Sequence, residues 1–100
     1  KPESAAAQSA LGSALARAGL IADAQQAFFQ AMTLEPDSPL HAYNLAVALD
    51  RLHKVDLAKT YYERALSLAE KASAGVRKSF PQQAARDRLE QLRSDGVAKP

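Results

Sequence analysis

The chain has 100 residues, of which 47% are hydrophobic, and this suits one domain with a core of modest size. Its net charge is only +2, so the composition does not require nucleic acid or an anionic membrane as a partner. Cysteine is absent, which excludes disulfides and thiolate chemistry, and no apolar run approaches the ~20 residues of a membrane span. The first residue is Lys1 rather than Met, so we expect an excised domain or a mature fragment.

The N-terminal third of the chain predicts a pair of helices. Residues 1–4 are expected to form a polar extension in which Ser4 caps a first helix that runs to about Ala18. Gly19 suits the left-handed position that ends such a helix, and Ile21 opens a second one. The second helix repeats apolar residues at the spacing of one helix face. These residues are Ala24, Ala27, Phe28, Ala31 and Leu34. The short connection predicts an antiparallel hairpin.

A cluster of turn residues separates this hairpin from the next helix. Pro36 is expected to stop the second helix, and Ser38 to cap a third. Pro39 fits the first helical position, where its missing N–H costs nothing. The third helix is predicted to run from Pro39 to about Leu52. Its core positions are Ala42, Leu45, Ala46 and Leu49.

The fourth predicted helix follows a turn at His53 and begins near Val55. Its apolar positions are Ala58, Tyr61, Tyr62, Ala65, Leu66 and Leu68. Because no proline follows at the place that Pro36 has in the first hairpin, we expect this helix to continue to about Ala74 before Gly75 stops it.

The last segment predicts a fifth helix. Phe80 precedes a proline, so it should be non-helical, and Pro81 should start the helix. Ala85, Leu89 and Leu92 then share one face. We expect this helix to cover the exposed face of the second hairpin, with Phe80 as its anchor, and residues 96–100 to be disordered.

The two hairpins repeat each other at an interval of 34 residues. The matched pairs are Leu11 and Leu45, Leu15 and Leu49, Ala24 and Ala58, Phe28 and Tyr62, Ala31 and Ala65, and Leu34 and Leu68. A fixed period in this range is typical of a helical solenoid, in which each hairpin buries its apolar face against a neighbour. The spacing of the leucines, small residues and aromatic residue resembles the tetratricopeptide repeat (TPR).

This resemblance implies an all-α TPR-type solenoid with two helix-turn-helix repeats and a C-terminal capping helix. The implied boundaries are repeat one at 5–38, repeat two at 39–72 and the capping helix at about 80–94, within one domain at 5–95. Such a unit is expected to be monomeric or weakly self-associating.

In the resembled family, the first helix of each pair lines a concave groove that holds an extended peptide or a partner helix. Carried over position by position, the resemblance implies a groove lined by Ser9, Ser13, Arg17, Leu40, Tyr43, Asn44, Val47, Asp50 and Arg51. Tyr43 offers contact area at a low entropy cost, and Arg17 and Arg51 can pair with carboxylates. Asn44 has two interpretations: it can bond a peptide backbone, or it can tie neighbouring helices together.

Catalytic and metal-binding patterns are missing from the sequence. His41 and His53 have no second ligand or positioned partner at a suitable spacing, so we expect them to be solvated or to act as caps. No phosphate-binding glycine loop, serine elbow or carboxylate pair is found either. The basic residues near the C-terminus alternate with acidic ones, which favours a solvated face over a nucleic-acid site. We therefore predict no enzymatic activity, no cofactor and no metal.

Two functions remain from the sequence. The first is a non-catalytic interaction module that binds a peptide or helix of a partner protein in the groove. The alternative is a structural or oligomerisation segment of a longer repeat protein, because two repeats fall short of the ~3 that such folds usually need. The second repeat and the final helices are similar to bacterial pilus-biogenesis and secretion proteins. That similarity implies a location on the cytoplasmic or periplasmic side of a membrane assembly, without direct membrane contact.

Overall fold

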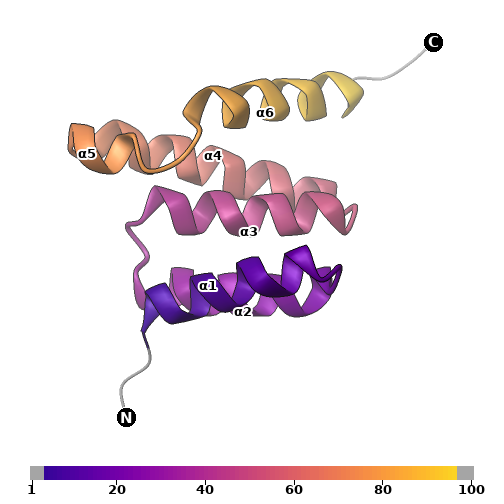
Figure 1. The fold of residues 1–100 in the computed structure, drawn as a ribbon. Helices are drawn as coiled ribbons and strands as arrows, with labels where there is room; N and C mark the ends of the chain where they lie inside the picture. The colour runs from indigo at the N-terminus through magenta and orange to yellow at the C-terminus, as the bar shows by residue number, and fades with distance from the viewer. Residues whose placement is uncertain (1–3, 97–100) are drawn as a thin grey trace.

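The computed structural model describes residues 4–96, and within this range the ordered elements are all helices (Figure 1). In chain order they are α1 (Ala5–Arg17), α2 (Ile21–Leu34), α3 (Pro39–Arg51), α4 (Val55–Lys71), α5 (Ala74–Arg77) and α6 (Gln82–Gly96). The prediction of an all-α fold is therefore confirmed for the described residues. The predictions of a polar extension and of a disordered tail fall mostly on residues 1–3 and 97–100, which lie outside this range.

The helix ends follow the predicted cap residues. The hydroxyl oxygen of Ser4 accepts a hydrogen bond from the backbone N–H of Ala7 at 3.2 Å, and Ser38 caps α3 in the same way. Pro39 occupies the start of α3, as predicted. Gly19 has a φ of +84° and closes the α1–α2 turn, where the left-handed conformation suits a residue without a Cβ.

The helices pack as a sequence of neighbours. α1 packs against α2, α2 also against α3, α3 against α4, and α4 against α6. Figure 1 shows them as rods crossing the molecule, with α1 in front of α2 at one edge and α6 at the other. α3 and α4 thus lie in the interior of the stack, and α1 and α6 at its edges.

The core is built from the matched positions of the two hairpins. Ala24, Ala31, Ala58 and Ala65 are fully buried where helices cross closely, and Leu45 is only 1% exposed. The equivalence fails at Leu11 and Leu34, which are 49% and 40% exposed. The repeat predicts a buried Leu11 because its counterpart is Leu45, and this is wrong, because α1 lies at the edge of the stack and no described helix covers its outer side. Leu34 is predicted on the apolar face of the second helix, but it is the last residue of α2 and is exposed there.

The end of α4 differs from the prediction. α4 stops at Lys71, and the hydroxyl oxygen of Ser73 accepts a hydrogen bond from the N–H of Val76 at 3.4 Å, which caps the short α5. Gly75 lies inside α5 instead of ending α4. A serine side chain competes for nearby backbone N–H groups in this way, which ends one helix and starts another.

The last helix follows its prediction closely. α6 begins at Gln82, directly after Pro81, and Phe80 is non-helical and buried. The predicted face of Ala85, Leu89 and Leu92 is also buried, against α4. Burial of this stripe accounts for the position of α6 at the edge of the stack.

Candidate partner-binding face

α1 and α3 are neighbours on one side of the molecule, and we call their shared surface the α1/α3 face. The side-chain amide of Asn44 on α3 donates a hydrogen bond of 3.5 Å to the hydroxyl of Ser9 on α1. Both residues are half-buried. Of the two interpretations of Asn44, the structure supports the tie between helices.

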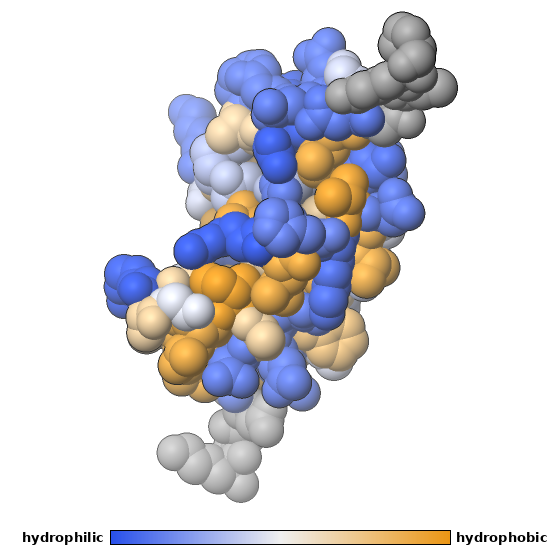
Figure 2. Space-filling view, turned by 90° about the vertical axis from the view of Figure 1, so that its right-hand side faces the viewer, coloured by the Kyte–Doolittle hydropathy of each residue, from blue (hydrophilic) through white to orange (hydrophobic). Residues whose placement is uncertain are grey.

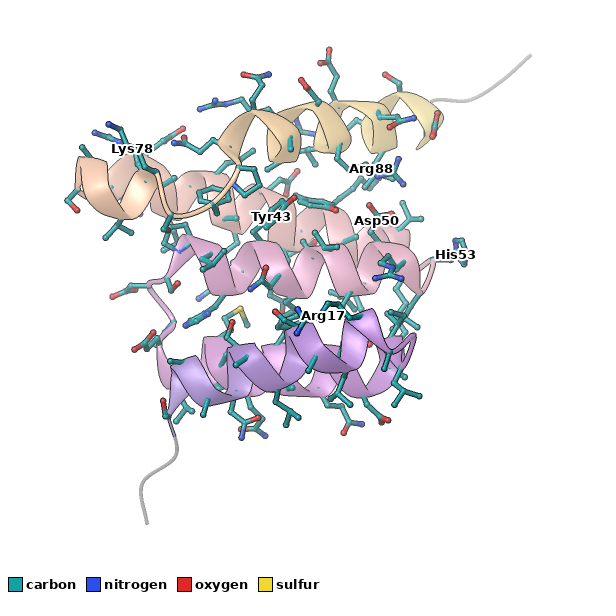
Figure 3. All side chains as sticks on the ribbon, viewed as in Figure 1. Arg17, Tyr43, Asp50, His53, Lys78 and Arg88 are labelled. Carbon is teal, nitrogen blue, oxygen red and sulfur yellow. The ribbon has the colours of Figure 1, made fainter. Side chains whose placement is uncertain are left out.

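The predicted groove residues differ in accessibility. Arg17 and Arg51 are exposed, and the remaining ones are half-buried. The half-buried residues are Ser9, Ser13, Leu40, Tyr43, Asn44, Val47 and Asp50. Figure 3 shows Arg17, Tyr43 and Asp50 on the side of α1 and α3 that faces the viewer.

Arg17 and Arg51 are the accessible charges of the α1/α3 face. They lie in the last turns of α1 and α3, where a positive charge is favoured by the helix dipole. Among residues 4–96, neither guanidinium forms an ion pair with a carboxylate. Two guanidiniums in equivalent positions can bind carboxylates of a ligand, because each offers a planar set of N–H donors.

The side chain of Tyr43 packs against other aromatic residues within the molecule. Its ring lies 6.0 Å from the ring of Tyr62 and 5.6 Å from that of Phe80, in tilted arrangements that aromatic pairs favour. Burial raises the pKa of its hydroxyl. Tyr43 therefore helps to hold the segment that leads into α6, and only part of its surface faces the predicted groove.

Asp50 is also occupied by a partner from the last helix. Its carboxylate accepts hydrogen bonds from Nε of Arg88 at 2.6 Å and from Nη2 at 2.8 Å, and from the hydroxyl of Tyr62 at 3.0 Å. The hydrogen bond from Arg88 holds the pKa of Asp50 below its usual value. Burial, with the neighbouring Asp50, raises the pKa of Tyr62. Asp50 thus joins α3 to α6 (Figure 3).

Sequence reasoning missed Arg88, which it grouped with the solvated basic residues. Arg88 directly precedes Leu89, which belongs to the buried stripe of α6. A residue at the edge of such a stripe lies close to the neighbouring helix, and this was the available signal. Nothing in the sequence indicates that Asp50, 38 residues earlier, is the partner. The contacts of Tyr43 with Phe80 and of Asp50 with Arg88 leave Arg17 and Arg51 as the accessible charged groups of the α1/α3 face.

No group of three or more histidine or acidic side chains that could hold a metal is found within residues 4–96. None of the helices in this range has the length and apolar character needed to cross a membrane. Figure 2 views the end that carries the α1–α2 and α3–α4 turns, where apolar areas are broken by hydrophilic groups.

Comparisons with known proteins supply no relative. The sequence matches no protein-family model, and no curated protein is significantly similar to it.

Proposed function

We propose that the chain is a non-catalytic interaction module, and that its α1/α3 face binds an extended peptide or a helix of a partner protein that carries acidic side chains. The observation that supports this most is the pair of exposed guanidiniums, Arg17 and Arg51, at equivalent places on two adjacent helices. The hydrogen bond from Asn44 to Ser9 links the same two helices.

We also propose that the architecture is of the TPR type. Support comes from structural equivalence at the 34-residue interval: Phe28 and Tyr62 are both buried, and both hairpin turns contain a residue with positive φ, Gly19 and His53. α6 would act as the capping helix of such a unit, since its apolar stripe lies against α4. A role in a bacterial pilus or secretion assembly stays an expectation from the sequence resemblance.

The binding proposal is tested by comparing three forms of the domain in partner capture from a bacterial lysate. The forms are the wild type, an Arg17→Ala, Arg51→Ala variant, and a control in which exposed Arg64 and Arg86 on α4 and α6 are replaced by alanine. Circular dichroism first establishes that all three are folded.

We expect the wild type and the control to retain the same partner and the Arg17, Arg51 variant to lose it, since each variant removes two positive charges but only one changes the α1/α3 face. Equal retention by all three forms would contradict the assignment of the face. Recovery of no partner by the wild type would favour the structural function described next.

A second function is supported by the outer side of α1 and α2. Leu11 is 49% exposed, and Leu11 and Leu15 line a hollow of about 310 Å³ with Ala27. No helix among the described residues covers this side. Exposed leucine side chains at the edge of a helical stack favour contact with another repeat.

Sedimentation equilibrium, which measures self-association, tests this second function. If the outer side of α1 and α2 stacks on another copy, the wild type associates as its concentration rises and Leu11→Lys stays monomeric. Leu57→Lys is the matched control, because Leu57 is 50% exposed but lies on α4. A wild type that is monomeric at all concentrations would count against stacking between copies.

A further inference from the structure

A pocket of about 650 Å³ lies between the loop that joins α2 to α3 and the short helix α5. Figure 1 shows α5 and the α2–α3 loop at the end of the molecule opposite to the α3–α4 turn. Its apolar lining includes Pro36, Leu40 and Val76, of which Val76 is 42% exposed. Leu40 is also the first α3 residue of the predicted groove, so the pocket adjoins the α1/α3 face at the N-terminal end of α3.

Glu35 and His41 form a polar pair on the wall of this pocket. His41 is only 6% exposed, and its Nε2 lies 2.9 Å from Oε1 of Glu35. The prediction that His41 is solvated or acts as a cap is wrong, because the side chain turns inward from the first turn of α3 and meets the carboxylate at the end of α2. An ionised carboxylate can only accept, so the hydrogen of a neutral His41 ring is on Nε2.

The other ring nitrogen of His41, Nδ1, is buried and has no hydrogen-bond partner within residues 4–96. A buried polar atom without a partner is unfavourable, and in native structures such an atom calls for an explanation.

Apart from His41, which pairs with Glu35, the ionisable residues that line the pocket are acidic. Glu35 and Asp37 contribute carboxylates, and no lysine or arginine is among the lining residues. An anionic ligand would be repelled, and a purely apolar ligand would cover the carboxylates without pairing them, which is costly. A ligand with an aliphatic stem and a positively charged N–H donor satisfies both parts of the lining.

We propose that this pocket binds a lysine or arginine side chain presented by a partner polypeptide. The aliphatic stem lies on Leu40, Pro36 and Val76, and the cationic head pairs with Glu35 and Asp37. A polypeptide fits better than a free amine because the pocket adjoins the α1/α3 face. The residues on either side of the basic residue can contact that face. This site is separate from Arg17 and Arg51, so it goes beyond the proposed function.

The test uses NMR titration of the ¹⁵N-labelled domain with blocked peptides. The probe is Gly-Leu-Lys-Leu-Gly, and its controls replace the lysine by norleucine or by glutamate. We expect the lysine peptide to shift the amide signals of Leu40, Val76 and Ser79, the norleucine peptide to bind about fivefold more weakly, the size of an exposed ion pair, and the glutamate peptide not to bind.

Variants localise the effect. Glu35→Gln with Asp37→Asn should weaken binding of the lysine peptide about fivefold or more, and Asp23→Asn, an exposed acid on α2 outside this pocket, should not. The Arg17→Ala, Arg51→Ala variant should bind the lysine peptide as the wild type does, so loss of the proposed function leaves this result intact.

Three results would overturn the proposal. They are equal shifts from all three peptides, absence of shifts in the pocket residues at millimolar lysine peptide, and binding that is unchanged in the Glu35, Asp37 variant. n-Butylammonium that binds as tightly as the lysine peptide would assign the pocket to a free amine and overturn the polypeptide partner.

Discussion

Gly19 and His53 occupy the same place in the two hairpin turns, and both have positive φ, +84° and +63°. Glycine adopts this conformation freely, whereas a residue with a Cβ loses roughly 1–2 kcal/mol there. The second turn therefore carries strain that the first turn lacks. His53 is exposed, and within the described residues its side chain forms no hydrogen bond that compensates for the strain.

We predict that His53→Gly raises the free energy of unfolding by about 0.5 kcal/mol, because relief of strain exceeds the extra entropy that glycine gives the unfolded chain. Gly19→Ala should lower it by about 1 kcal/mol, for the opposite reason. Urea denaturation followed by circular dichroism measures both. A loss of stability in His53→Gly would contradict the account of the turn.

Gly12 is required because no room is left for a side chain, and not because of its dihedral angles. A Cβ added to Gly12 would lie 2.6 Å from ring atoms of the buried Phe28, whereas at Gly75 nothing lies within 4 Å. We predict that Gly12→Ala lowers the free energy of unfolding by about 1 kcal/mol. Overpacking destabilises the fold by ~1–3 kcal/mol, and the higher helix propensity of alanine offsets up to ~1 kcal/mol of this.

Gly75→Ala is the matched control for Gly12→Ala. It should leave stability unchanged or raise it by up to ~1 kcal/mol, because α5 gains helix propensity without a clash. Thermal unfolding of the two variants under the same conditions gives the comparison. Equal effects would mean that the ring of Phe28 moves aside at little cost.

At the scale of elements, α6 is held to the rest of the molecule by a small set of contacts. Phe80 packs on Tyr43, and Arg88 forms two hydrogen bonds to Asp50. Asp50 is 12% exposed and Arg88 38%, so the pair is partly screened by solvent. The apolar stripe of α6 supplies the remaining attachment through burial.

The Asp50 to Arg88 pair makes the stability depend on pH. Because the folded pKa of Asp50 is lowered, its contribution is complete well above the unfolded value of about 3.9 and is lost as the pH falls below that value. We predict that Asp50→Asn costs about 1 kcal/mol at pH 7 and that the difference from the wild type shrinks between pH 4 and pH 2. Urea denaturation across this range measures it, and a difference that is constant with pH would contradict the ion pair.

Removal of α6 tests its role as a cover for α4. We predict that truncation after Lys78 lowers the midpoint and the cooperativity of thermal unfolding, because Tyr62 and Ala69 lose neighbours and Asp50 loses Arg88. Truncation after Gly96 is the control and should leave the transition unchanged. An unaltered transition after removal of α6 would mean that the five preceding helices are stable alone.

Local chemistry was predictable, and distant partners were not. The caps Ser4 and Ser38 were found from sequence because a cap bonds a backbone group only three residues away. The ion pair of Arg88 was not predicted because its partner, Asp50, is 38 residues away on another helix. The contact of His41 with Glu35 was not predicted for a related reason. The spacing of the two residues in the chain did not show that they would face each other across the α2–α3 loop.

At the scale of the whole molecule, position in the stack decides what a residue contributes. Leu11 and Leu45 match in sequence, yet Leu45 is enclosed and Leu11 is 49% exposed. Periodicity identifies the apolar face of a helix, but it does not reveal whether another helix covers that face. This is why the repeat predicted the interior of the stack better than its edge.

The same pair gives a prediction. Leu45→Ala should lower the free energy of unfolding by roughly 2–5 kcal/mol, the range for a cavity at a buried leucine, while Leu11→Ala should cost below about 1 kcal/mol. Chemical denaturation of both variants provides the measurement. Equal losses would imply that α1 is covered in solution, by another copy or by chain outside the described residues.

The charges near the two ends of α3 are opposite in sign. Glu35 and Asp37 lie by its N-terminus, and Arg51 lies in its last turn, about 16 Å from Leu40 along the helix axis. A partner that spans both ends in an extended form needs a basic and an acidic residue about five positions apart. Such a segment must place its basic residue beside Glu35 and Asp37 and its acidic residue beside Arg51, so a peptide with acidic residues at both positions would bring like charges together at the N-terminal end of α3.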